Sequence, residues 1–180
     1  MLKTFSEHNQ QAPLHTDSQY RSTPERFIAL IALHQAQCGG GYTELVDFQT
    51  ILQNLNRTQF GRSVIYFFSQ NRFPIAVPSI FQEPLKPKYI NSKIISEQPL
   101  IRYRYDTLKA GLSLFNLSEY QVSFYSQKLD LLDSLIQTSP YRIRFLLSSN
   151  DLLILDDHRF LHGRSSFTDP NRLLLRCKMN

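Results

Sequence analysis

Short apolar segments separated by turn residues recur along the chain, and this pattern constrains the fold more than any other feature. Each segment spans fewer than ten residues, which is short for a core helix, and all are rich in aliphatic, β-branched or aromatic side chains. We expect strands at "FIALIAL" (27–33, buried), "RSVIYFFS" (62–69), "FPIAVPSIF" (73–81), "LIRYRYD" (100–106), "LLIL" (152–155) and "RLLLRCKM" (172–179). Many short strands and frequent turns favour a β-sandwich or jelly-roll with a few helices.

Two helices are expected among these strands. "FQTILQNL" (48–55) resembles a short helix, and a longer one begins near Ser118, where Ser118 and Gln121 fit a capping box. Apolar residues then recur at helical spacing, at Val122, Tyr125, Leu129, Leu132 and Ile136. We interpret the longer helix as scaffold and not as part of a functional site.

The composition indicates a folded domain with a basic surface. Hydrophobic residues make up 42% of the 180 residues, enough for a core, and the length fits one domain over residues 1–180. The net charge is +5, but Lys and Arg are scattered, so a nucleic-acid-binding function is only a weak alternative. The same positive charge would suit a site that binds carboxylates.

The cysteines and the N-terminus predict where the protein is found. Cys38 and Cys177 form no CxxC motif, which is typical of reduced thiols in a cytosolic protein. The first ten residues, "MLKTFSEHNQ", do not read as a signal peptide, and no apolar run is long enough to cross a membrane. We therefore expect a cytoplasmic protein that does not bind a membrane.

A first candidate metal site lies near the N-terminus, in "PLHTDSQY". If this segment is a strand, His15 and Asp17 are two residues apart and point to the same face. An imidazole and a carboxylate would then converge on one point, as metal ligands must. Such pairs are common by chance, and a surface strand with a polar face explains this one equally well.

The segment "DDHRFLHGRSSF" holds two further histidines, His158 and His162. Their spacing of four would place both on one face of a helix, where they could share a metal ion. The flanking segments are strand-like, however. In an extended chain the two residues lie about 13 Å apart, too far to share an ion. We therefore expect one of them to act alone, and the other to be a polar residue near a turn.

The last expected strand supplies candidate anion-binding residues. Arg172, Leu174 and Arg176 alternate and share one face. If that face points inward, its arginines need an anion, and a planar guanidinium suits a carboxylate; otherwise the face is simply solvated. Two histidines and one carboxylate would leave three coordination positions open, as in non-haem Fe(II) oxygenases.

Taken together and in order, these motifs resemble a known family. "LHTDSQY", "FIALIAL", "GGYTELVD" and "DDHRFLHGRSSF" followed by "RLLLR" are similar to the conserved segments of Fe(II)/2-oxoglutarate-dependent dioxygenases of the taurine dioxygenase and clavaminate synthase-like group. The resemblance covers most of the chain, and both order and spacing agree. It implies a mainly β fold with helices, a double-stranded β-helix (jelly-roll) of the clavaminate synthase-like kind.

The resemblance also implies a site. The expected iron ligands are His15, Asp17 and His162, and the expected 2-oxoglutarate contacts are Thr43 and Arg176. Arg172 matches a position that can meet an anionic substrate or the cosubstrate, and Arg164 is either part of a structural ion pair or a wall of the substrate pocket. His158 is then the polar turn residue. Gly163 is expected to allow a close backbone approach, and Asp157 departs from the family pattern, which usually has Asn.

The function implied is oxidation of an unactivated carbon, by hydroxylation or a related outcome, in a small polar molecule such as an amino acid or a sulfonate. O2 and 2-oxoglutarate would be consumed, and succinate and CO2 released. Only fourteen residues precede His15, whereas family members usually carry a substantial segment there. The alternative is therefore an inactive or fragmentary member that acts as a binding or structural subunit, and a homo-oligomer could complete the barrel.

Overall fold

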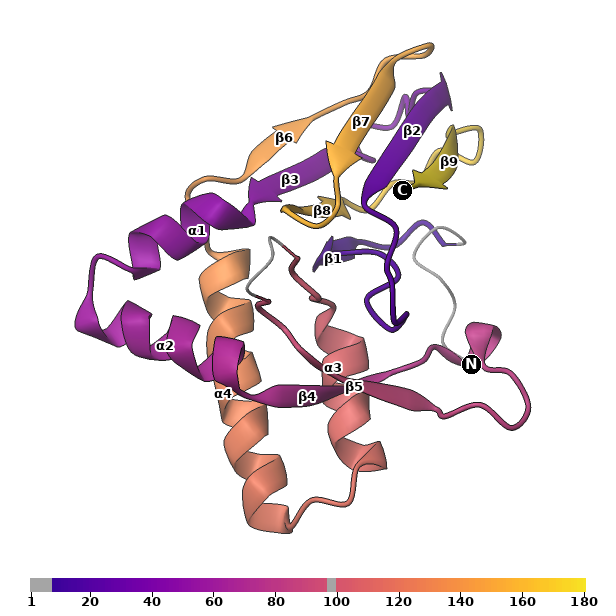
Figure 1. Ribbon diagram of the computed structural model, residues 1–180. Helices are drawn as coiled ribbons and strands as arrows, with labels where there is room; N and C mark the ends of the chain where they lie inside the picture. The colour runs from indigo at the N-terminus through magenta and orange to yellow at the C-terminus, as the bar shows by residue number, and fades with distance from the viewer. Residues whose placement is uncertain (1–7, 97–99) are drawn as a thin grey trace.

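The computed structural model describes residues 8–96 and 100–180 (Figure 1). Residues 1–7 lie outside the described residues. They make up most of the ten N-terminal residues that do not read as a signal peptide. The strands are β1 (Ala12–His15), β2 (Phe27–His34), β3 (Thr43–Asp47), β4 (Arg72–Ala76), β5 (Tyr89–Lys93), β6 (Ile143–Phe145), β7 (Leu152–Asp156), β8 (Phe160–Arg164) and β9 (Leu173–Met179). The helices are α1 (Phe48–Leu55), α2 (Gln59–Gln70), α3 (Tyr105–Leu114) and α4 (Glu119–Gln137), with a short 3₁₀ turn, η2, at Ser79–Phe81.

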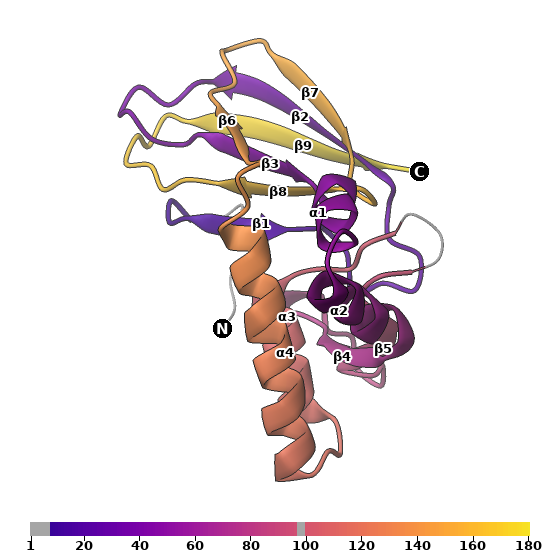
Figure 2. The same cartoon turned by 90° about the vertical axis from the view of Figure 1, so that its left-hand side faces the viewer.

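Two antiparallel sheets form the double-stranded β-helix that the family resemblance implies. One sheet has the strand order β1-β8-β3-β6 and the other has the order β7-β2-β9. Figure 2 shows them stacked together, with α1 beside β8 and with α2, α3, α4 and the small β4-β5 hairpin gathered below β1. Within the described part of the chain, no helix is both long and apolar enough to cross a membrane.

Strand alternation divides the four-stranded sheet into an apolar and a polar face. Leu14, Val46 and Leu161 are buried in the main core, which they share with all four helices. The neighbouring residues on the same strands point to the opposite face, between the two sheets. There the register pairs Leu45 with His162. Polar groups are therefore placed inside the jelly-roll, while most of the apolar core lies outside it.

The longer helix begins as predicted. Ser118 caps α4 and its hydroxyl accepts a hydrogen bond from the backbone N–H of Gln121, whose side chain completes the capping box. Leu129, Leu132 and Ile136 are fully buried on one face of α4. The prediction of a short helix over residues 48–55 is also confirmed, by α1.

The prediction of a strand over residues 62–69 is wrong, because this segment lies in helix α2. Thr58 caps the helix by accepting from the backbone N–H of Gly61. Val64 and Phe68, four apart, are both buried against the core. The aromatic and β-branched residues that suggested a strand are here the buried side of a helix, and tertiary packing overrides their weak intrinsic preference.

Two other strand predictions are only partly correct. Residues 73–81 contain strand β4 and then the 3₁₀ turn at 79–81. Residues 100–104 form only an isolated bridge between Ile101 and Ile95, and helix α3 begins at Tyr105. This segment instead fixes the loop after β1, because the buried Arg102 guanidinium donates to the backbone carbonyls of Gln19 (2.9 Å) and Ser22 (2.8 Å).

The outer face of the three-stranded sheet is apolar and exposed. Residues 27–33 form a strand as predicted, but only one face of it is buried, since Ile31 is 39% exposed. Its register partners on either side are also exposed, Leu152 on β7 and Leu175 on β9. The prediction that residues 27–33 form a buried strand is therefore right for the face that meets the other sheet and wrong for the outer face.

Asp47 gives a test of the link between β3 and α1. Its carboxylate caps α1 by accepting from the N–H of Gln49 at 3.0 Å and pairs with the Arg159 guanidinium, which holds the pKa of Asp47 below its usual value. A lowered carboxyl pKa stabilises the fold above the ordinary value near 4, and this contribution is lost as the pH falls through the lowered pKa. We predict that Asp47→Ala lowers the free energy of unfolding by about 1 kcal/mol at pH 7.

The measurement is urea unfolding of both proteins at several pH values. The difference between them should shrink below about pH 4, where the unfolded carboxyl begins to protonate. Asp47→Asn, which keeps an N-cap acceptor but loses the charge, should recover part of the loss. A difference that does not change with pH would contradict the role of the ion pair.

Candidate metal centre

His15, Asp17 and His162 converge inside the jelly-roll. His15 ends β1, Asp17 follows two residues later, and His162 lies in the middle of β8, directly paired with His15. One ligand atom from each lies within 4.8 Å of the other two, and the imidazole centroids are 4.3 Å apart. All three side chains are largely buried. In the described residues this is the one group of three or more His, Cys, Asp or Glu side chains so arranged.

Asp17 lies beyond the end of β1, so it is not held by the strand alternation that the sequence suggested. The adjacent residue, Thr16, is bound to Tyr103 in both directions: its N–H donates to the Tyr103 carbonyl at 2.7 Å, and its hydroxyl accepts from the Tyr103 N–H at 3.0 Å. Ser18 then adopts a positive φ of 50°, which turns the chain sharply. These contacts bring the Asp17 carboxylate back beside the two histidines.

The two oxygens of Asp17 face different partners. Oδ1 lies 3.6 Å from Nε2 of His15 and 4.0 Å from Nε2 of His162. Oδ2 accepts a hydrogen bond from Nη1 of Arg176 at 2.7 Å and lies 3.4 Å from Nζ of Lys178. Burial by itself would raise the pKa of Asp17, but the histidines and Arg176 outweigh it and hold that pKa well below its usual value. The group is therefore an anion with one oxygen turned toward the histidine ring nitrogens.

Both imidazoles present Nε2 to this shared point. Nδ1 of His15 lies 2.8 Å from the carbonyl oxygen of Pro13, and Nδ1 of His162 lies 3.1 Å from Oδ1 of Asp157. An oxygen acceptor at Nδ1 favours the proton there and leaves the Nε2 lone pair for a metal. Two imidazole nitrogens and one carboxylate oxygen form the donor set of a facial triad, so these residues fit Fe(II).

The two histidines differ in their pKa values. Burial, and then the charge of His162, lower the pKa of His15. Burial also acts to lower the pKa of His162, but the contact with Asp157 and the charge of Asp157 outweigh it, and the net shift is upward. A metal ion needs both rings neutral at Nε2, so it would compete with a proton mainly at His162.

A cavity of about 190 Å³ adjoins the two histidines, between the sheets. Its lining includes Thr43 on β3, Leu30 on β2, and three arginines: Arg164, Arg172 and Arg176. Burial and the nearby Arg172 lower the pKa of Arg164 to about 10, which indicates that positive charge accumulates here. Such a cavity is suited to an anion with some apolar surface.

Arg164 is both a structural residue and a wall of this cavity. Its Nη2 donates to the backbone carbonyls of His8 at 2.7 Å and Gln10 at 2.6 Å, so its partners are carbonyls and not the ion pair that was one expectation. The guanidinium also lies over the ring of Phe167, as does that of Arg172, each 4.8 Å from the ring centroid. Phe167 therefore contacts two cations at the cavity wall.

Arg172 and Arg176 occupy different ends of the cavity. Arg176 reaches Asp17 at the end beside the three converging residues. Arg172 lies against Gly41, where a β-carbon would be 2.9 Å from its Nε. Gly40, in the same run of three glycines, also allows a close approach, since a β-carbon there would meet the Ser166 carbonyl at 2.4 Å. Gly163 does the same within the sheet, facing the carbonyl of Ala12 at 2.8 Å.

His158 is not part of the cluster. It lies on the turn between β7 and β8, and its Nε2 is 3.2 Å from the carbonyl of Pro24. The helical two-histidine alternative is therefore wrong. Sequence reasoning passed over Lys178, although it continues the alternation of Arg172 and Arg176. Asp157 was noted only as a departure from the family pattern.

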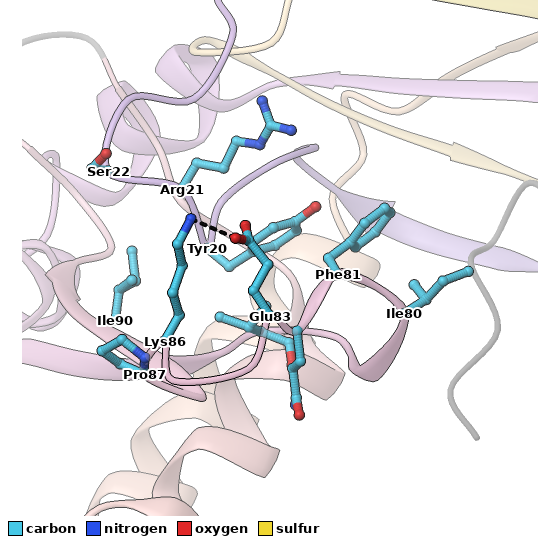
Figure 3. A pocket seen from close by; sticks show the side chains of 11 residues that line it. Tyr20, Arg21, Ser22, Ile80, Phe81, Glu83, Lys86, Pro87 and Ile90 are labelled. Carbon is cyan, nitrogen blue, oxygen red and sulfur yellow. Dashed lines mark hydrogen bonds and ion pairs between the residues drawn. The ribbon is translucent and has the colours of Figure 1, made fainter.

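A larger hollow of about 530 Å³ lies elsewhere and contains none of the three converging residues (Figure 3). Tyr20, on the loop after Asp17, stacks on Phe81 with ring centroids 5.5 Å apart. Glu83 and Lys86, on the segment between β4 and β5, form an ion pair at 2.7 Å and are largely exposed. This hollow is a surface feature formed by two loops, and it lacks the buried polar groups of the metal centre.

Comparison with known proteins gives one family and one fold. The model of the family described as taurine catabolism dioxygenase TauD, TfdA family matches residues 3–178. No curated protein sequence is significantly similar to the chain. Among solved structures, asparagine oxygenase in complex with Fe(II), 2S,3S-3-hydroxyasparagine and succinate is 16% identical with a TM-score of 0.69, over 95% of this chain and 50% of that chain.

Two further structures are similar. The non-haem iron oxygenase OrfP in complex with Fe and α-ketoglutaric acid is 16% identical, with a TM-score of 0.67, over 96% of this chain and 50% of that chain. PvcB from Pseudomonas aeruginosa is 17% identical, with a TM-score of 0.63, over 99% of this chain and 60% of that chain. The chain thus spans about half the length of the first solved oxygenases that it matches.

At these identities the structures show the fold, which confirms the predicted double-stranded β-helix of the clavaminate synthase-like kind. The family match covers nearly the whole chain, including every residue of the converging cluster. The chain therefore belongs to the taurine catabolism dioxygenase TauD, TfdA family of Fe(II)/2-oxoglutarate-dependent oxygenases.

Proposed function

We propose that this protein is an Fe(II)- and 2-oxoglutarate-dependent oxygenase that oxidises an unactivated carbon of a small polar molecule. The observation that carries the proposal is the convergence of two Nε2 atoms and one carboxylate oxygen beside an arginine-lined cavity. Asparagine oxygenase, with its hydroxylated amino acid and succinate, supports an amino acid as the substrate class. We further propose that residues 1–180 form one domain and that the protein is cytoplasmic, which its free thiols support.

Each part of the site has a separate task. His15, Asp17 and His162 would hold the iron, and Arg176 and Lys178 would balance the carboxylate charge on the side away from it. When bound, iron and 2-oxoglutarate supply the oxidising chemistry, with O2 consumed and succinate and CO2 released. Leu30, Leu174 and Phe167, which line the same cavity, limit access of water to the reacting centre.

For the distal carboxylate of 2-oxoglutarate we propose Thr43 together with Arg172. The resemblance pointed to Thr43 and Arg176. The hydrogen bond from Arg176 to Asp17 supports a different role for Arg176, at the metal end, where it orients the carboxylate and can meet an anionic group of the substrate. Arg172 lines the same cavity as Thr43 and has no acidic partner among the described residues. Its planar guanidinium suits bidentate contact with a carboxylate.

The second candidate is an inactive member of the family that serves as a binding or structural subunit, alone or in a homo-oligomer. The exposed apolar face of the β7-β2-β9 sheet is consistent with it, since exposed apolar patches often mark interaction surfaces. Metal binding does not separate the two candidates, but turnover does.

Turnover is tested by succinate release. With Fe(II), 2-oxoglutarate, O2 and a panel of free amino acids and sulfonates, we predict succinate formation that depends on one class of substrate and is abolished in Asp17→Ala. The measurement is succinate by enzyme-coupled assay together with mass spectrometry of the substrate. If the folded protein binds Fe(II) and 2-oxoglutarate but no panel member yields succinate above the Asp17→Ala background, the second candidate is favoured.

Metal binding is tested with the two histidines of the β7–β8 segment as a matched pair. Under anaerobic conditions, Fe(II) and 2-oxoglutarate should give the wild-type protein a visible metal-to-ligand charge-transfer band. We predict that His162→Ala abolishes the band and that His158→Ala retains it, because only His162 faces His15 and Asp17. Absence of the band from folded wild-type protein would refute the site, and its loss in His158→Ala alone would refute the ligand assignment.

The roles of the arginines are tested by titrating 2-oxoglutarate into the anaerobic Fe(II) protein and following the same band. Removing a charged hydrogen-bonding partner costs about 1.5–3 kcal/mol, so we predict 2-oxoglutarate affinity to fall roughly 10- to 100-fold in Arg172→Ala. Thr43→Val should weaken it less. Arg144→Ala, an exposed arginine on β6, is the control and should leave the affinity unchanged. Unaltered affinity in Arg172→Ala would return the role to Arg176.

A further inference from the structure

Asp157 is a buried carboxylate that contacts two of the three proposed metal ligands. It lies on the turn just before β8, is 1% exposed, and its own N–H donates to the carbonyl of Arg26 at 2.7 Å, which holds its backbone in place. Oδ2 accepts a hydrogen bond from the backbone N–H of Asp17 at 2.8 Å. Oδ1 lies 3.1 Å from Nδ1 of His162. One side chain thus connects ligands from opposite ends of the chain.

The hydrogen-bonding capacity of these groups determines what can stand at position 157. A backbone N–H can only donate, and a carboxylate offers acceptors at both oxygens. Neither Oδ1 of Asp157 nor Nδ1 of His162 has a hydrogen-bond partner elsewhere among the described residues. If Oδ1 accepts, the proton of His162 must be on Nδ1, and the Nε2 lone pair is free to face Asp17 and a metal.

We propose that Asp157 is a positioning residue that selects the Nδ1–H tautomer of His162 and at the same time orients Asp17. The part of this proposal that concerns a metal rests on the proposed function, whereas the tautomer itself does not. Asparagine, which the family resemblance leads one to expect here, has one acceptor and one donor in place of two acceptors. In this geometry it can accept from the Asp17 N–H or from an Nδ1–H of His162, but not from both.

The substitution Asp157→Asn therefore has a defined consequence. If the amide oxygen keeps the bond to the Asp17 N–H, its NH₂ group faces Nδ1 of His162 and favours the Nε2–H tautomer, which blocks the metal-facing nitrogen. If the amide flips, its NH₂ group opposes the Asp17 N–H and the carboxylate ligand is displaced. Either outcome weakens metal binding. Losing a residue that hydrogen-bonds to the metal ligands, without being a ligand itself, typically lowers metal affinity 10- to 100-fold.

The first measurement reads the tautomer without any metal. The full chain is labelled with ¹⁵N-histidine, and long-range ¹H–¹⁵N correlation spectra are recorded on metal-free protein at about pH 8.5, with the His162 signals assigned by their absence in His162→Gln. We expect the Nδ1–H tautomer in the wild type and a shift toward Nε2–H in Asp157→Asn. His158 in the same spectra should not change.

The second measurement is the affinity for Co(II) alone, from its visible absorption. We expect Asp157→Asn to bind 10- to 100-fold more weakly than the wild type. Asp156→Asn is the matched control, because Asp156 ends β7 next to Asp157 but pairs with Arg26 and does not contact the ligands. Far-UV circular dichroism and thermal midpoints of the metal-free proteins separate loss of positioning from loss of fold.

Two results would overturn the proposal. One is a wild-type His162 that carries its proton on Nε2, which can be read even if Asp157→Asn does not fold. The other is an unchanged tautomer and Co(II) affinity in a folded Asp157→Asn protein. Neither result depends on iron, 2-oxoglutarate or turnover. If the protein shows no turnover, the tautomer measurement still tests the role of Asp157. If the tautomer is not the expected one, the succinate assay still tests the proposed function.

Discussion

The antiparallel pairing of β1 with β8 is the contact on which the rest of this structure depends. It places His15 directly opposite His162, although the two come from opposite ends of the chain. Gly163 makes the pairing possible, because any side chain there would meet the carbonyl of Ala12. The apolar residues that alternate with this pair, Leu14 and Leu161, are buried in the main core. Burial of one face of the sheet therefore fixes the register, and the register assembles the polar site on the other face.

Grouping charged and titratable side chains inside the jelly-roll requires each to have a partner. Asp17 is anionic between two histidines on one side and two cations of β9 on the other. Asp157 contacts Nδ1 of His162 and accepts a hydrogen bond from the backbone N–H of Asp17. An unpaired charge in such a place would cost several kcal/mol, so the partners stabilise the arrangement together and removing one leaves another unsatisfied. This preorganisation is what a metal-binding site needs.

Several elements were predictable because their signals are local. The capping box at Ser118 and the helical spacing after it determine α4, and the short apolar run at 152–155 determines β7. The strand expected at 62–69 is a helix, since its aromatic residues fit both structures and only packing against the core decides between them. In the segment 100–106, expected to be a strand, Arg102 and Tyr103 instead hold the loop that carries Asp17, and helix α3 begins at Tyr105. No local pattern predicts a role that depends on contacts with residues more than eighty positions away.

The sequence by itself determined the family, the jelly-roll class and the identity of the residues that converge, because the order and spacing of the motifs are properties of the chain alone. Only the tertiary structure decided which oxygen or nitrogen each of them presents. It is the folded chain that sets Arg176 against Asp17, Arg172 against Gly41, and Asp157 between two ligands. The physical reason is that hydrogen bonds and ion pairs act over about 3 Å, and residues so distant in the chain reach that separation only when the sheets close.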